Sequence, residues 1–415
     1  MMKLLIITYN FPPLNVISSH RFNELSCFLR DHGITSWILT THSIGTLVSK
    51  VPEENIIRIG FNHKNNEKSQ EIHGWIGLLR NIVMKLKCRS KIFDYSLRWY
   101  WAVQRSLKQY APIFSQMDFI IGSYGPAAPF FIANDISRKF KIPWIADYRD
   151  LCSLGQLHYS NQLLSYFDRL MEEKLIRNTV GLLTISNHLA SILYSFFHKC
   201  SYVIYNGWNQ SDLHDDTAPL HDRLNQNGQY LFYGGTINEN RIPSILMVLN
   251  AMRMHPDLFI KLRSLGPRKS ESIILNFANK NHLSKNIQIL PPVSHQQSIK
   301  EARHSFCNLV LEDISPKFDY QKGILTGKFL KLLPLPSPVM AVACPGSEIG
   351  GILEDTGKGC LCSNEEEILH FLNQIKNHSS RYVGISERVR CYSLRSQAEK
   401  LACILSELKS ISEQQ

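Results

Sequence analysis

Short apolar segments alternate with amphipathic segments along the whole chain, and this alternation constrains the fold more than any other feature. Residues 4–9 predict a strand, residues 21–32 a helix that Gly33 ends, and residues 35–40 the next strand. The same rhythm predicts strands at 118–122, 142–147, 181–186 and 201–205, and helices at 129–140, 161–177 and 188–197. Strands joined by helical crossovers indicate a parallel sheet with helices on both faces.

A polar stretch at residues 210–229 interrupts this pattern, which then begins again. The second half predicts strands at 230–233, 258–265, 287–290, 306–311 and 339–342, and helices at 244–254, 272–281, 295–302, 328–333, 365–376 and 396–409. A chain of 415 residues exceeds what one hydrophobic core supports, so we expect two α/β, Rossmann-like domains. We place them at residues 1–208 and 229–395, with a linker at 209–228 and a C-terminal helix and tail at 396–415.

Several common classes of protein are not expected from this sequence. It contains no GxGxxG, P-loop, HExxH, GxSxG or DxD motif, which argues against a conventional dinucleotide site and against a dedicated metal site. The ten cysteines are scattered and form no CxxC pair, as is typical of reduced thiols in the cytosol. No apolar run reaches the length of a membrane span, so a cytoplasmic protein is expected.

The net charge of +11 favours anionic partners. Residues 80–108 hold eight basic residues against one acid, Asp94, and they alternate with tryptophans and aliphatic residues. Such a stretch suits the headgroup level of an anionic membrane. A solvated helical face with a buried aromatic anchor is the other interpretation, and both stay open. No recognised nucleic-acid module accompanies the charge, so nucleic acid is not expected as a partner. The basic residues are Arg80, Lys85, Lys87, Arg89, Lys91, Arg98, Arg105 and Lys108.

Several strings, in order along nearly the whole chain, resemble the bacterial branch of family 4 glycosyltransferases. They are residues 3–13 followed by Arg21, then 94–101, 142–150, 184–186, 203–208, 234–236, 323–328 and 347–359. The resemblance implies a GT-B fold, with two Rossmann-like domains facing each other across a cleft and a C-terminal helix that can return to the N-terminal domain. It also implies a retaining, metal-independent transferase without a cofactor. Such enzymes move a sugar from a nucleotide-sugar donor to a saccharide acceptor, often lipid-linked, in surface polysaccharide or lipopolysaccharide synthesis at the inner face of the membrane.

Sugar transfer of this kind expels a diphosphate, so the donor site must stabilise negative charge. Basic side chains, backbone N–H groups and a helix N-terminus can do this without a metal. Arg241 lies where the family usually has a lysine that contacts the diphosphate, and Lys328 begins a predicted helix. The resemblance therefore implies donor binding by Gly234, Gly235, Thr236, Arg241, Gly323, Ile324, Leu325, Thr326 and Lys328.

The chain departs from the family pattern at the donor site. The family generally carries two glutamates eight positions apart, and Gly323 and Lys331 stand in their places. Thr236 replaces a usual arginine, and Arg149 falls where many members have a histidine. Two alternatives therefore stay open: a non-catalytic GT-B protein that binds a glycan or a partner transferase, and a GT-B sugar-nucleotide epimerase.

On the N-terminal side, Asp147, Arg149 and Asp150 follow a predicted strand, where open α/β sheets bind their ligands. We interpret them as catalytic, with Arg149 held between carboxylates and one carboxylate aimed at an acceptor hydroxyl. The alternative is a structural ion-pair network. The residues expected to contact the acceptor are Pro13, Asn15, Arg21, Ser123 and Tyr124.

Overall fold

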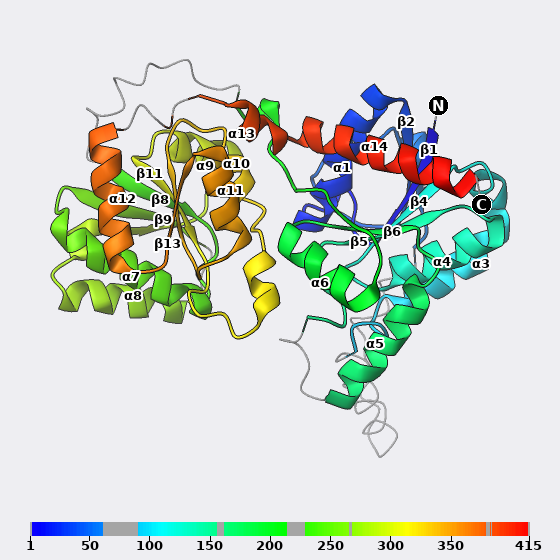
Figure 1. Ribbon diagram of the computed structural model, residues 1–415, viewed down its shortest axis with the longest axis horizontal. Helices are drawn as coiled ribbons and strands as arrows, with labels where there is room; N and C mark the ends of the chain where they lie inside the picture. The colour runs from blue at the N-terminus through cyan, green and yellow to red at the C-terminus, as the bar shows by residue number, and fades with distance from the viewer. Residues whose placement is uncertain are drawn as a thin grey trace. The chain divides into compact units, whose positions relative to one another are not determined.

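The computed structural model describes residues 2–60, 90–155, 162–213, 229–264, 268–378, 382 and 384–413. The chain forms two compact units, each of which is described here by itself (Figure 1). Unit 1 combines Met1–Tyr205 with Leu394–Gln415, and unit 2 is Asn206–Ser393. The expected linker lies mostly outside the described residues, and so do Arg80, Lys85, Lys87 and Arg89.

Unit 1 is built on a seven-stranded sheet in the order β3-β2-β1-β4-β5-β6-β7, and every pairing is parallel. Its strands are β1 (Met2–Thr8), β2 (Ile34–Thr40), β3 (Ile56–Arg58), β4 (Phe119–Ser123), β5 (Trp144–Tyr148), β6 (Gly181–Thr184) and β7 (Ser201–Val203). The central strands are buried along their whole length, because helices cover both faces of the sheet. Burial on both faces is the reason why these strands appear in the sequence as continuous apolar runs.

Six α-helices belong to the described part of unit 1: α1 (Ile17–Leu29), α3 (Leu97–Phe114), α4 (Ala128–Phe140), α5 (Gln162–Ile176), α6 (Asn187–Phe197) and α14 (Leu394–Glu413). The short 3-10 segment η1 (Arg30–His32) joins α1 to β2, and η2 (Glu53–Asn55) precedes β3. Helix α14 returns from the end of the chain and packs against α1 (Figure 1). Its Leu401 and Leu405 are fully buried in the same core as Leu4 of β1. The expected return of the C-terminal helix is confirmed.

Unit 2 contains a six-stranded parallel sheet in the order β10-β9-β8-β11-β12-β13. Its strands are β8 (Gln229–Gly234), β9 (Leu258–Arg263), β10 (Ile287–Leu290), β11 (Cys307–Leu311), β12 (Val339–Val342) and β13 (Gly359–Cys362). Its α-helices are α7 (Ile242–Ala251), α8 (Arg268–Lys280), α9 (His295–Arg303), α10 (Phe329–Leu332), α11 (Glu348–Thr356), α12 (Glu365–His378) and α13 (Glu387–Cys391). Its 3-10 segments are η5 (Gln210–Leu213), η7 (Glu239–Arg241), η8 (Met252–Met254), η9 (Ser284–Asn286) and η10 (Asp319–Gly323).

The strand order places a switch point in each sheet. In unit 1, β1 pairs with β2 on one side and β4 on the other, and in unit 2, β8 pairs with β9 and β11. The chain connections run in opposite directions from these central strands, so the loops beyond their carboxyl ends separate. Open α/β sheets bind ligands at such points.

The structure differs from the sequence prediction at two sheet edges, at helix ends and in helices α11 and α13, which were not predicted. The edge strands β3 and β13 were not predicted, although the equally short edge strands β7 and β10 were. The helix expected at 328–333 is the single turn α10, and Lys328 is its N-cap. Helix α1 begins at Ile17, earlier than expected. No helix in the described ranges is long and apolar enough to cross a membrane.

Candidate functional sites

The switch point of unit 2 lies where β8 ends, at Gly234, and the chain turns through Gly235 and Thr236. The Tyr233 hydroxyl donates to the Thr236 carbonyl over 3.0 Å and folds the turn back on the strand. A Cβ atom at position 235 would lie 2.5 Å from the Tyr233 hydroxyl oxygen, so a larger residue here would displace the Tyr233 ring. The Gly235 N–H donates to the Arg263 carbonyl over 3.1 Å, so the glycine pair forms a tight turn at the end of the sheet.

Arg241 closes this turn from the other side. Its Nη1 donates to the Thr236 carbonyl over 2.9 Å, and its Nη2 lies 3.1 and 3.2 Å from the two carboxylate oxygens of Glu312. Glu312 follows β11 directly, and β11 is the strand beside β8 at the switch point. Burial raises the pKa of Glu312, and this effect outweighs the lowering by Arg241. An arginine and a glutamate are thus paired at the position where this fold binds ligands.

Lys328 adds a second cation to the same turn. Its Nζ donates to the Gly234 carbonyl over 2.7 Å. Desolvation and the charge of Arg241 both lower the pKa of Lys328, which indicates that the two cations are neighbours. With Glu312 ionised, the cluster of Arg241, Lys328 and Glu312 carries one net positive charge, and exposed Lys328 gives access to it from solvent.

The remaining donor-side residues lie on the segment before Lys328. Gly323 ends η10 and is buried, Leu325 is buried, and Ile324 is exposed. The Phe329 N–H donates to the Thr326 carbonyl over 3.0 Å, which forms the turn into α10. The structure therefore brings Lys328 to Gly234 and Arg241, while the buried side chains of this segment belong to the core.

Lys331 occupies the second of the two positions where the glycosyltransferases that the sequence resembles have a glutamate. It lies on α10, and its Nζ is 3.5 Å from Nε2 of His295, the first residue of α9. A lysine beside a histidine cannot accept hydrogen bonds from ribose hydroxyls as a carboxylate does.

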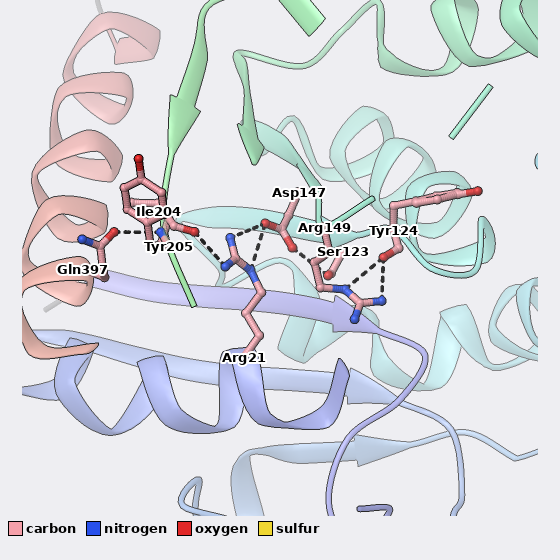
Figure 2. A network of polar contacts seen from close by, with 8 residues as sticks. All are labelled: Arg21, Ser123, Tyr124, Asp147, Arg149, Ile204, Tyr205 and Gln397. Carbon is pink, nitrogen blue, oxygen red and sulfur yellow. Dashed lines mark hydrogen bonds and ion pairs between the residues drawn. The ribbon is translucent and has the colours of Figure 1, made fainter. Parts of the chain in front are cut away.

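In unit 1, Asp147 forms a buried ion pair with Arg21 (Figure 2). Asp147 Oδ1 lies 2.7 Å from Nη2 and 3.2 Å from Nε of Arg21, and Asp147 Oδ2 accepts from Ser123 Oγ over 2.8 Å. Arg21 also donates to the Ile204 carbonyl over 2.9 Å. Asp147 is fully buried and Arg21 is 4% exposed. This geometry favours the structural network over contact with an acceptor for Arg21, Ser123 and Asp147.

Arg149 is not held between two carboxylates, which corrects the expected arrangement. Its Nε and Nη2 donate to the Tyr124 carbonyl over 3.2 and 3.0 Å (Figure 2). Nη2 also donates to the Gly125 carbonyl over 3.2 Å. The reason is that Asp147 points to Arg21, while Asp150 is exposed. Burial lowers the pKa of Arg149, whereas Asp147 and Asp150 oppose this. Gly125 has φ +101°, and its bare Cα leaves room for the guanidinium.

The other acceptor-side residues divide between core and surface. The Tyr124 ring is buried against Tyr148, with centroids 6.3 Å apart, so its backbone carbonyl is the part that faces Arg149. Pro13 and Asn15 lie on the loop after β1, where Asn15 Oδ1 is 3.0 Å from His20 Nε2. Three of the polar side chains predicted for the catalytic or acceptor site are therefore accessible to solvent at this edge of the sheet. Asn15 and Asp150 are exposed, and Arg149 is half-buried.

Within the described part of the basic stretch, residues 97–108 belong to the amphipathic helix α3, and Lys91 lies before it. Trp99 is fully buried and packs edge-on against Tyr9, with ring centroids 5.6 Å apart. Arg98, Trp101, Arg105 and Lys108 are exposed, and their spacing places them on one side of the helix. Helix α3 therefore combines a buried aromatic anchor with an exposed basic side that carries one tryptophan.

Glu312 is the site residue that the sequence analysis missed. A signal was present, because Glu312 is the first polar residue after an apolar strand beside the switch point. No group of three or more His, Cys, Asp and Glu residues that could hold a metal ion occurs in the described ranges.

No protein-family model and no curated protein matches the chain. Solved structures do match it along nearly its whole length. Sucrose-phosphate synthase from Thermosynechococcus elongatus is 12% identical with a TM-score of 0.63, over 99% of this chain and 100% of that one. Anabaena HepE in complex with UDP and glucose is 14% identical with a TM-score of 0.59, over 98% and 100%. UDP-GlcNAc 2-epimerase from Neisseria meningitidis, bound to UDP-GlcNAc, is 13% identical with a TM-score of 0.52, over 98% and 100%.

Likeness at this identity shows the fold. The chain has the GT-B fold, with one Rossmann-like parallel sheet in each unit, as expected from the sequence. Both glycosyltransferases and a sugar-nucleotide epimerase share this architecture. The residues of the two candidate sites, and not the fold, therefore determine the function of this protein.

Proposed function

We propose that this protein is a retaining glycosyltransferase, related to family 4, that moves a sugar from a nucleotide-sugar donor to a saccharide acceptor. The observation that carries the proposal is the cluster at the switch point of unit 2. There two cations, Arg241 and Lys328, meet at the glycine turn after β8. A diphosphate fits this combination, because its negative charge is offset by cations at close range.

The chemistry follows from the leaving group. Breaking the bond between the sugar and the diphosphate places negative charge on the phosphate oxygens, and Arg241 and Lys328 offset that charge as it develops. The acceptor hydroxyl attacks the same face of the sugar that the diphosphate leaves, and the departing phosphate takes the hydroxyl proton. Neither a protein nucleophile nor a metal is needed for this route, and we propose that the enzyme uses no cofactor.

Glu312 adjusts the donor site. It aligns the guanidinium of Arg241 through both carboxylate oxygens, but its negative charge also opposes the approach of a diphosphate. The pKa of Glu312 is raised by burial, so protonation is easier there than for an exposed glutamate. Arg241 can then exchange its carboxylate partner for a phosphate.

The donor and acceptor classes are proposed from the resemblance and from the solved structures. HepE was solved with UDP-glucose, so a UDP-sugar is the first donor to test. The acceptor is proposed to be lipid-linked, in surface polysaccharide or lipopolysaccharide synthesis, on the cytoplasmic side of an anionic membrane. The exposed basic side of α3 supports this placement, because Arg98, Arg105 and Lys108 would be attracted to anionic headgroups.

Two other functions have specific support. The solved epimerase shares the fold, and an epimerase would act on a free UDP-sugar without an acceptor. A non-catalytic binding protein is favoured by Gly323 and Lys331, which replace both family glutamates. Lys331 lies beside His295, so the ribose must be held in another way.

Calorimetry with UDP-, GDP- and dTDP-sugars, followed by a turnover assay with lipid-linked saccharide acceptors, tests these alternatives. The proposal expects binding of one donor class and release of its nucleoside diphosphate only when an acceptor is present, with activity that survives EDTA. Conversion of the donor without an acceptor would establish the epimerase instead. Donor binding without turnover on any acceptor would indicate a binding protein, and no donor binding would refute the proposal.

A further inference from the structure

Helix α5 buries two acidic side chains and exposes a row of apolar ones. Asp168 and Glu172 are fully buried, while Tyr166, Phe167 and Leu170 are 56%, 60% and 44% exposed. Leu163, one turn earlier, is also exposed. The spacing of positions 163, 166, 167 and 170 places these four apolar side chains on one side of the helix. An exposed apolar stripe of this kind marks an interaction surface.

The buried acids hold α5 in this orientation. Asp168 accepts from Ser90 Oγ over 2.7 Å and from the Lys91 N–H over 2.6 Å. Glu172 accepts from the Ser153 N–H over 2.9 Å and also from its hydroxyl. Turning the apolar stripe inward would break these hydrogen bonds and expose the side of the helix that forms the core. The exposure of the stripe is therefore built into the packing of unit 1.

Basic residues lie at the C-terminal end of the stripe. Lys174 and Arg177 follow it at and beyond the end of α5, and both are exposed. Lys199 Nζ donates to the Arg177 carbonyl over 2.9 Å, which brings a third cation to the same end. Arg169 lies with its Cζ 5.2 Å from the ring centroid of Phe196, a further exposed aromatic residue on α6. Glu173 is the exposed acid of this helix.

We infer that the α5 stripe, defined as Leu163, Tyr166, Phe167 and Leu170, inserts into the headgroup region of an anionic lipid surface. Apolar and aromatic side chains flanked by lysine and arginine suit that environment, where the chains enter the interface and the cations meet lipid phosphates. A second copy of the chain suits it less well, because a symmetric contact would bring the same cations together. The inference rests on the proposed function, since it assigns the surface by which the enzyme reaches a lipid-linked acceptor.

The experiment compares two double variants of the full chain in vesicle co-sedimentation. Phe167→Ser with Leu170→Ser removes the apolar part of the stripe. The matched control, Met254→Ser with Ile411→Ser, removes two apolar side chains that are 72% and 53% exposed elsewhere. Vesicles consist of phosphatidylcholine alone or of phosphatidylcholine with phosphatidylglycerol. Circular dichroism verifies that both variants are folded, and calorimetry with UDP-glucose is run on each.

We expect the parent and the control to bind phosphatidylglycerol-containing vesicles, and the stripe variant to bind them at least about tenfold more weakly. Lys174→Glu with Arg177→Glu should weaken binding at low salt and have less effect at high salt. Equal vesicle binding by the stripe and control variants would overturn the inference, as would no binding by the parent. A dimer of the parent that becomes a monomer in the stripe variant, without lipid, would assign the surface to a second copy. Donor binding is measured separately. A parent protein that binds the vesicles but binds no nucleotide sugar would refute the proposed function without refuting the lipid surface.

Discussion

Nη2 of Arg21 lies 2.7 Å from Oδ1 of Asp147, and this ion pair joins α1 to the carboxyl end of β5 inside unit 1. The remaining oxygen of Asp147 accepts from Ser123, and Arg21 reaches the Ile204 carbonyl. The next residue, Tyr205, has its N–H bound by Gln397 of α14 over 2.8 Å (Figure 2). Within unit 1, these contacts link α1, the ends of β4 and β5, the residues after β7, and helix α14.

Asp147→Asn should destabilise unit 1 by about 3–5 kcal/mol, because it leaves the buried charge of Arg21 without its counterion. Urea denaturation measures the change in the free energy of unfolding. Asp150→Asn is the matched control, and its exposed position predicts a change within about 0.5 kcal/mol. Equal stability of the two variants would mean that the Arg21–Asp147 pair contributes nothing.

Arg241→Ala should weaken binding of the nucleotide sugar by about 1.5–3 kcal/mol, because a charge-assisted contact to phosphate is lost. Glu312→Gln should act in the opposite direction and tighten UDP binding, since it removes the negative charge beside Arg241. Calorimetry at two salt concentrations measures both changes. Unchanged affinity in a folded Arg241→Ala variant would exclude Arg241 from the donor site.

Asp150→Asn should lower turnover far more than it changes donor affinity. Asp150 is the exposed carboxylate at the end of β5 and is free to approach an acceptor hydroxyl, whereas Asp147 is fully buried. Steady-state kinetics with varied acceptor, together with donor calorimetry, separates the two effects. A variant with normal specific activity would show that Asp150 has no part in the reaction.

Glu301 should make unit 2 sensitive to acid. Burial raises the pKa of Glu301, but hydrogen bonds from Arg263 and Lys261 lower it more, to about 2, from an ordinary value of 4.5. Its contribution to stability is therefore complete above pH 4.5 and is lost as the pH falls towards 2. Denaturation midpoints measured across this window should fall less steeply for Glu301→Gln than for the parent. Parallel curves would contradict the prediction.

Much of the fold could be predicted from local sequence. The strands at the centre of each sheet are buried on both faces, so they appear as apolar runs, and the helices between them carry a clear amphipathic period. The edge strands β3 and β13 were missed, whereas the equally short edge strands β7 and β10 were predicted. The strand order depends on pairings between distant segments, which the local pattern does not record.

The candidate sites divide in the same way. The sequence by itself determined the glycine turn at 234–236, the position of Arg241 and the strand-end placement of Asp147 and Asp150, because these depend on short motifs. Tertiary structure decided what those residues contact. Glu312 is 71 positions from Arg241, and Asp147 is 126 positions from Arg21, so only the folded sheet brings each pair together.

The sequence also does not show which side of helix α5 is buried. Its sequence determined an amphipathic helix, and an apolar side is ordinarily expected to face the core. The structure instead buries Asp168 and Glu172, because backbone and hydroxyl donors of two distant segments, Ser90–Lys91 and Ser153, satisfy their carboxylates. Which side of a helix turns inward is decided by the partners that its polar groups find, and those partners exist only once the chain has folded.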